Sequence, residues 1–145
     1  MKKLLTVVAL FVAMNSIANA NITVNEKVLT AFKQTFASAS NPVWHEYADY
    51  YIVKFNQNDI DTRIKYDLEG NILETTRYYK EDALPIILRA KLKNRFADKT
   101  VFGVTEVSNH SEITYYIVLE DQKNWLNIKT DVYGNMQLEK KFKKA

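Results

Sequence analysis

Cysteine is absent from this sequence of 145 residues, and there are only three glycines, two prolines and two histidines. The lack of cysteine excludes disulfide bonds, thiol catalysis and thiolate metal sites. Three glycines are too few for a phosphate-binding loop, which needs several of them close together. No Gly-x-Ser-x-Gly motif is present to present a serine nucleophile. The sequence holds no recognisable catalytic constellation, and we expect a protein that is not an enzyme.

The two histidines, His45 and His110, are far apart in the sequence. A metal site would need further ligands brought in by folding. Acidic pairs occur at Glu81-Asp82 and Glu120-Asp121, where we expect the ends of structural elements, and solvated carboxylates are common there. We therefore expect neither a metal nor a cofactor.

The first 20 residues have the three parts of a secretory signal peptide. Lys2 and Lys3 precede an apolar run at 4–14, and Ala18-Asn19-Ala20 offers small residues at a cleavage site. A membrane-spanning helix needs about 20 apolar residues, so this run is too short for stable membrane insertion. A buried core helix is the alternative. The pattern predicts cleavage after Ala20 and a periplasmic or secreted protein.

Residues 21–145 then form the mature chain, which has the length of one domain. The signal peptide removes two lysines, which leaves 18 basic residues against 17 acidic ones. A net charge near +1 gives no strong attraction to polyanions, so we expect no nucleic-acid partner.

Apolar side chains recur every four residues in two segments, and this spacing places them on one face of a helix. We expect Asn25 to cap the first helix and Asp82 the second, with Pro85 in the first turn of the latter. The two stripes lie 60 residues apart and comprise Val24, Val28, Phe32 and Phe36, then Leu84, Leu88, Leu92 and Phe96.

Each expected helix is followed by segments rich in Tyr, Val, Ile, Thr and Phe, which favour strands. Asp67–Asn71 and Asp131–Asn135 share the pattern Asp-x-x-Gly-Asn, which suits tight hairpin turns with glycine at positive φ. Calcium binding by these acids is the alternative, but it needs more oxygen ligands. We expect strands at 43–48, 50–56, 60–67, 71–79, 101–107, 113–120, 124–131 and 135–143.

These elements predict an α+β fold. Two tandem repeats, at about 22–80 and 82–144, would each supply one helix and four antiparallel strands to one sheet with the helices on one face. The register between the repeats has two solutions, because Tyr50–Val53 and Tyr115–Val118 are identical at a spacing of 65, whereas the turns lie 64 apart. A slip of one residue exchanges the two faces of a strand. At 64, Tyr51 and Tyr115 face the helices and Tyr116 faces away, which keeps apolar residues inside.

The sheet face away from the helices is the candidate recognition surface. Tyrosine, tryptophan and arginine are enriched at binding hot spots. The alternative is an amphipathic sheet face that merely tolerates tyrosines. The partner-binding residues we expect are Tyr50, Arg63, Tyr79, Tyr116 and Trp125.

These features together resemble the PepSY-like family of exported bacterial proteins, whose fold is likened to that of the β-lactamase inhibitory protein. The resemblance rests on the signal peptide, Val43-Trp44, Leu84-Pro85 and the two Asp-x-x-Gly-Asn turns. One departure is that the second repeat has no tryptophan matching Trp44. From the open face we expect an exported, non-enzymatic binding module that grips a protein or peptide partner, and the resemblance adds an inhibitor-like role as a fold-level analogy. The alternative is a periplasmic carrier of a small apolar or peptide ligand.

Overall fold

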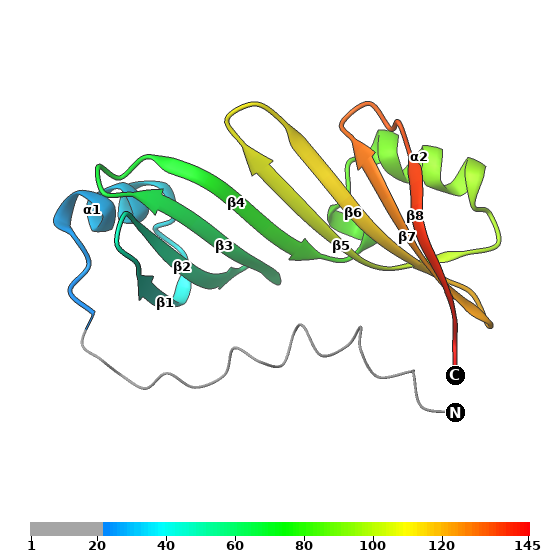
Figure 1. The fold of residues 1–145 in the computed structure, drawn as a ribbon, viewed down its shortest axis with the longest axis horizontal. Helices are drawn as coiled ribbons and strands as arrows, with labels where there is room; N and C mark the ends of the chain where they lie inside the picture. The colour runs from blue at the N-terminus through cyan, green and yellow to red at the C-terminus, as the bar shows by residue number, and fades with distance from the viewer. Residues whose placement is uncertain (1–21) are drawn as a thin grey trace.

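The computed structural model describes residues 22–145, and the expected signal peptide lies outside these described residues. Eight strands form one antiparallel sheet in which each strand pairs with its neighbours in the sequence (Figure 1). The expected α+β class is confirmed. In chain order the elements are α1 (Glu26–Thr35), β1 (Ser40–Glu46), β2 (Tyr50–Gln57), β3 (Ile60–Asp67), β4 (Ile72–Tyr79), the short 3-10 helix η1 (Glu81–Ala83), α2 (Ile86–Arg95), β5 (Thr100–Asn109), β6 (Ile113–Glu120), β7 (Asn124–Asp131) and β8 (Gln137–Lys143).

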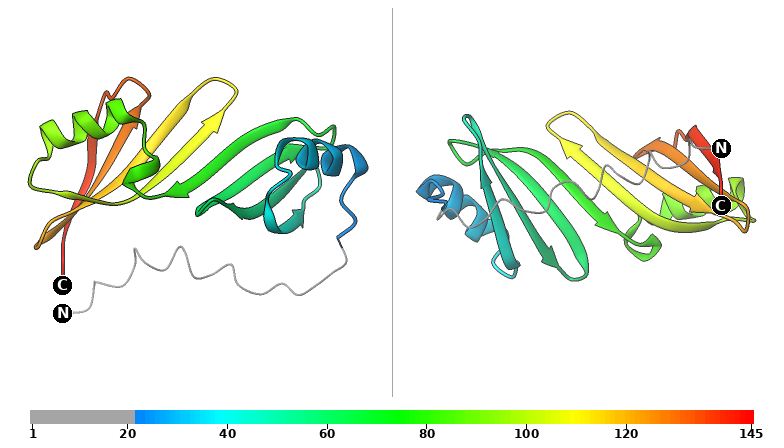
Figure 2. Two further views of the ribbon diagram at one scale, coloured as in Figure 1. Left: turned by 180° about the vertical axis from the view of Figure 1, so that it is seen from behind. Right: turned by 60° about the horizontal axis from the view of Figure 1, so that its bottom comes forward.

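Both helices pack on the same face of the sheet, at opposite ends (Figure 2). The stripe of α1 packs against β1–β3, and the stripe of α2 packs against β5–β7 and against Tyr79 of β4, so the molecule has two separate hydrophobic cores. Val28 and Phe32 of α1 pack in the first core, and Leu88 and Leu92 of α2 pack in the second. No helix among residues 22–145 is long and apolar enough to cross a membrane.

The register predicted from a spacing of 64 is confirmed. Tyr51 is 6% exposed and packs with α1, and Tyr115 is 5% exposed and packs with α2. Tyr116 is 37% exposed on the other face. The pleat of each strand therefore directs alternate side chains to the helices and away from them.

The two helices begin differently. Asn25 caps α1 as expected, because its side-chain oxygen accepts a hydrogen bond from the backbone N–H of Lys27 at 2.8 Å. The expected cap of α2 by Asp82 is wrong, since Asp82 lies in η1 and Pro85 is the N-cap residue. Proline disfavours helical backbone at the residue before it, and Leu84 is extended with ψ 139°. Pro85 is extended as well, with ψ 135°, so the helix begins after it.

A β-bulge in β4 changes which side chains face the helices. Lys65 of β3 pairs with Glu74, but the next residue, Tyr66, pairs with Ile72, so Leu73 is an extra residue in the ladder. An extra residue inverts the alternation beyond it. As a result, Tyr79 faces α2 and not the opposite side.

Both Asp-x-x-Gly-Asn segments form the expected hairpin turns, with φ of +91° at Gly70 and +81° at Gly134. The Asp67 carboxylate accepts hydrogen bonds from the backbone and side-chain amides of Asn71, both at 2.8 Å. Each turn also contacts the helix of its own half: the Asn25 side chain donates to a carbonyl of the first turn, and the Lys91 ammonium to one of the second. The turns therefore brace the helices against the sheet.

Candidate functional site

The open face is the side of the sheet that faces away from α1 and α2. Its members alternate along each strand with buried residues of the two cores, and they neighbour one another across the strand ladders. Figure 1 and Figure 2 show the strands that carry it. By this register the larger aromatic and basic side chains of the open face include Tyr50, Lys54, Arg63, Lys65, Tyr78, Tyr116, Trp125, Lys129, Lys140 and Phe142. The acidic side chains of Asp61, Glu74 and Glu120 lie on the same face.

The structure places four of the five expected partner-binding residues, namely Tyr50, Arg63, Tyr116 and Trp125, on this open face. The expected position of Tyr79 is wrong. The bulge in β4 turns Tyr79 inward, where it is only 6% exposed and belongs to the core under α2. The same inversion brings Tyr78 to the open face. Tyr78 is missing from the expected residues because they assume regular alternation through β4, without a bulge.

At one end of the open face, Tyr50 makes two ring contacts. It stacks on Tyr47 with ring centroids 4.5 Å apart and planes 17° apart. The ammonium of Lys65 lies 4.0 Å from the Tyr50 ring centroid, a cation–π geometry that holds the ring in place. This end therefore presents an ordered aromatic pair beside a positive charge.

Two tyrosines lie in one row at the centre of the open face. Tyr78 pairs with Thr105, which pairs with Tyr116, which pairs in turn with Lys129. The Lys129 ammonium is 5.9 Å from the Tyr116 ring centroid. Only a small threonine separates the two tyrosines, so their rings belong to one surface that a partner could cover.

At the other end of the open face, Trp125 is half-buried by two neighbours. The Phe102 ring meets it edge-on with centroids 4.8 Å apart, and the Lys144 ammonium lies 4.3 Å from its ring centroid. Phe102 is 49% exposed because a β-bulge in β5 places it out of the regular ladder. No residue pattern in the sequence marks that bulge. About five strand spacings of roughly 4.8 Å separate this group from Tyr50, so the open face holds separate aromatic groups along its length.

The helix face between the two cores carries a polar cluster. The Tyr79 hydroxyl donates to Glu106 at 2.6 Å, and the Arg77 guanidinium contacts the same carboxylate at 3.2 Å. Burial, and then the bond to the Glu106 carboxylate, raise the pKa of Tyr79 well above its usual range. Tyr79 and Arg77 both contact the Glu106 carboxylate, so the cluster is a hydrogen-bond and ion-pair network that supports the fold and not an exposed reactive site.

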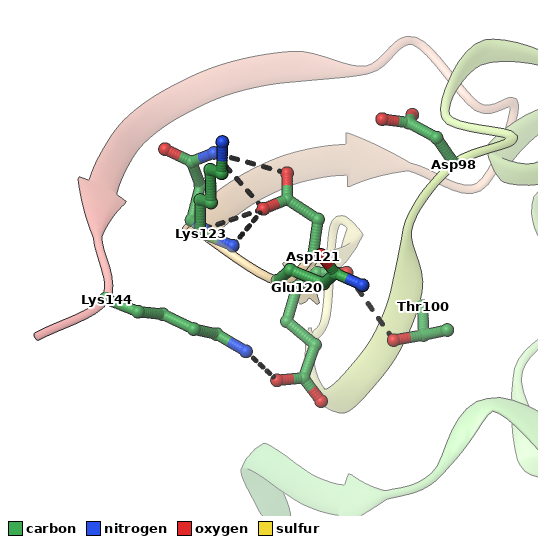
Figure 3. Close-up of a pocket in the computed structure, with 8 residues that line it drawn as sticks. Asp98, Thr100, Glu120, Asp121, Lys123 and Lys144 are labelled. Carbon is green, nitrogen blue, oxygen red and sulfur yellow. Dashed lines mark hydrogen bonds and ion pairs between the residues drawn. The ribbon is translucent and has the colours of Figure 1, made fainter.

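A depression of about 650 Å³ lies at the β6–β7 hairpin and is lined by polar and charged residues (Figure 3). The Lys99 ammonium bridges Asp98 at 2.8 Å and Asp121 at 2.9 Å, and Lys144 contacts Glu120 at 2.5 Å. The bond from Lys99 and the backbone N–H groups of the turn hold the pKa of Asp121 well below its usual range. These carboxylates already form ion pairs and hydrogen bonds within the fold. Their role is to hold the β6–β7 hairpin and the chain end in place.

A smaller groove of about 390 Å³ lies between α1 and β1. Its lining is mainly apolar, and Phe32 and Trp44 meet edge-on within it at 5.2 Å. Trp44 and Phe36 are only half-buried, so their rings remain accessible. In the part of the chain that the structure describes, no cluster of three His, Asp or Glu side chains could hold a metal ion.

The arrangement defines an α+β domain with a single open sheet face. No family model matches the chain, and no curated protein matches it. Among solved structures it is similar to a BLIP-like protein from Bacteroides fragilis, with a TM-score of 0.62 and 15% identity over 90% of this chain and 92% of that one.

Two further structures share the fold. One is a DUF2874 family protein from Bacteroides ovatus, with a TM-score of 0.61 and 18% identity over 84% of this chain and 89% of that one. The other is a proposed periplasmic protein from Bacteroides eggerthii, with a TM-score of 0.59 and 19% identity over 81% and 87%. These identities establish likeness of fold alone. The expected resemblance to the BLIP-like fold is confirmed.

Proposed function

We propose that this chain is an exported, non-catalytic binding module that grips a protein or peptide partner with its open face. The observation that carries the proposal is the set of ordered aromatic side chains on a sheet face that neither helix covers. Tyr116 is 37% exposed at the centre of that face, and Phe102 is 49% exposed at one end. Aromatic rings held by neighbouring cations lose little conformational freedom on binding, so they are efficient anchors.

Export to the periplasm or the medium is part of the proposal. It is supported by the signal-peptide pattern of residues 1–20 and by the neighbour described as a proposed periplasmic protein. An inhibitor-like role is supported by the BLIP-like neighbour, at the level of fold. We expect the partner to be neither a nucleic acid nor a membrane.

We also infer that residues 22–80 and 82–144 are two copies of one unit. Both units run helix then four strands, and both helices end at a phenylalanine with nearly equal backbone angles, φ −126° at Phe36 and −132° at Phe96. Superposition of the two halves in a crystal structure should place Phe36 on Phe96 and Gly70 on Gly134. A best superposition that needs another register would contradict the inference.

The experiment is capture of a partner from an envelope extract by the mature protein, followed by affinity measurement with the purified partner. Trp125→Ala should weaken binding by about 2 kcal/mol or more if it is a hot spot, and Tyr116→Ser should weaken it as well. Tyr133→Ala is the matched control, because Tyr133 is an exposed aromatic side chain, 74% exposed, at the β7–β8 turn. Equal affinity for all four proteins would remove the open face from consideration.

The groove between α1 and β1 supports a second candidate function, the carrying of a small apolar ligand. Its volume of about 390 Å³ falls within the range of ligand pockets, and phenylalanine and tryptophan rings line it. Native mass spectrometry of the protein purified from its host tests this function. A bound small molecule that is lost in Trp44→Ala would support a carrier, and a mass equal to that of the bare chain would count against one.

A further inference from the structure

A cluster of basic side chains occupies the open face of the first half. Lys54 of β2 and Arg63 of β3 are direct cross-strand partners, and Lys65 follows two residues along β3 on the same face. Directly opposed residues on adjacent strands have Cβ atoms about 5 Å apart, so like charges at such positions destabilise the sheet. The chain therefore holds two positive charges together at a cost to folding.

Neither member of the pair forms an ion pair within residues 22–145. The ion pairs of residues 22–145 involve Arg77, Lys99 and Lys144, and neither Lys54 nor Arg63 takes part in one. The neighbour of Arg63 on β4 is Thr76, which carries no charge, whereas Lys65 lies opposite the acidic Glu74. Asp61, two residues before Arg63 on the same face, accepts a hydrogen bond from the neutral Asn56 amide and forms no ion pair with Lys54 or Arg63.

The positive charge is local. The mature chain has 18 basic and 17 acidic residues, so a basic cluster on the open face leaves the rest of the surface nearly balanced or acidic. Such a local field attracts negative groups and increases the rate of their association. The ordered Tyr50 ring lies beside Lys65 and supplies an apolar contact next to the charges.

We propose that Lys54, Arg63 and Lys65 bind carboxylates of an acidic protein segment, so that the partner of the open face is recognised by clustered Asp and Glu residues. This inference rests on the proposed function and names the chemistry of its partner. The arginine can hold a carboxylate through two parallel N–H groups, and the lysines add point charges on either side. Aromatic rings next to the cluster favour a protein over an anion that has no apolar surface.

Poly-L-glutamate is the probe for this surface, with NMR chemical shifts of the mature protein as the readout. We expect shifts at the basic cluster, an affinity that falls steeply between about 50 mM and about 500 mM NaCl, and a loss of about tenfold or more in Lys54→Gln/Arg63→Gln. The matched control is Lys27→Gln/Lys93→Gln, which removes the same charge from exposed positions on α1 and α2. This control should bind like the unmodified protein.

The binding experiment overturns the inference if poly-L-glutamate does not bind, if both double variants lose affinity equally, or if a DNA duplex binds equally well at the same cluster. Stability gives an independent readout, because Lys54→Gln relieves the like-charge contact. Its melting temperature should equal or exceed that of the unmodified protein, and a fall of more than about 3 °C would assign the pair to folding and sink the idea.

The proposed function can stand when this inference fails. A captured partner that is lost in Trp125→Ala but binds Lys54→Gln/Arg63→Gln with full affinity would keep the open face and reject the acidic segment. A partner whose binding none of these substitutions weakens would reject both.

Discussion

Two buried tyrosines should respond in opposite ways to loss of the hydroxyl group. Tyr79→Phe removes a donor 2.6 Å from the Glu106 carboxylate, whose side chain is only 12% exposed. Hydrogen bonds to charged groups contribute about 1.5–3 kcal/mol, and Arg77 still contacts Glu106 in the variant, so we expect a loss of about 2 kcal/mol. The Tyr66 hydroxyl is buried, and no hydrogen bond to it is present among residues 22–145. Tyr66→Phe should therefore be neutral or stabilise by up to about 1 kcal/mol.

Urea denaturation followed by circular dichroism measures both free energies of unfolding. For a domain of this size, 1 kcal/mol corresponds to about 3–5 °C, so Tyr79→Phe should lower the melting temperature by about 6–10 °C. Tyr116→Phe is the control, because that ring lies on the open face and should change stability little. Equal losses in the three variants would refute the reasoning, since they would mean that the hydroxyl partners do not decide the outcome.

The unmodified protein and Tyr79→Phe should also differ in how their stability changes at alkaline pH. Burial and the bond to Glu106 raise the pKa of Tyr79, so its stabilising contribution is complete below about pH 10 and decreases as the pH rises toward the folded-state pKa. The stability advantage over Tyr79→Phe should shrink above about pH 10. An advantage that grows with pH would contradict the assigned bond.

Three further outcomes are expected. Phe32→Ala should lower the free energy of unfolding by about 3–5 kcal/mol, because Phe32 is only 5% exposed. Phe36→Ala and Phe96→Ala should each lower it by less, about 2–3 kcal/mol, because those rings are half-buried. Urea melts measure all three losses. The bonds from Asn71 lower the pKa of Asp67, so its contribution to stability is present above the ordinary carboxyl pKa and is lost as the pH falls through the lowered value; Asp67→Asn should flatten this acid dependence in melts at successive pH values. The intact mass of the exported protein should correspond to cleavage after Ala20, and a mature form that retains Met1 would contradict export by this route.

The strands were predictable because alternation and turn signals agree along most of the chain. β6 and β7 begin and end where the sequence predicts, since Asn124 follows a turn and Leu126 and Ile128 alternate with polar residues. The choice of face in β6 was also predictable. Only at a spacing of 64 does Phe55 correspond to the apolar Leu119 and not to the charged Glu120, and burial of Tyr115 confirms that choice.

The β4 side chains were not predictable in the same way. A bulge depends on how two strands meet, and the residues from Ile72 to Tyr79 do not alternate strongly enough to reveal one. The error at Tyr79 and the omission of Tyr78 from the candidate site have this single cause. Phe102 was missed for a similar reason, because a bulge in β5 places it on the surface.

The sequential strand order has a consequence for how the chain folds. Every ladder except β4–β5 closes a loop of a few residues, and β4 and β5 are separated only by the segment that contains η1 and α2. Contacts between residues that are close in the sequence cost less chain entropy to form. Sheets whose strands pair with their sequence neighbours therefore fold faster than sandwiches that pair distant strands. Because the first core is formed by α1 and β1–β3, these elements can assemble before α2 and β5–β8 are in place. When such a chain crosses a membrane with its N-terminus first, the first half can therefore begin to fold on the far side while the second half is still crossing.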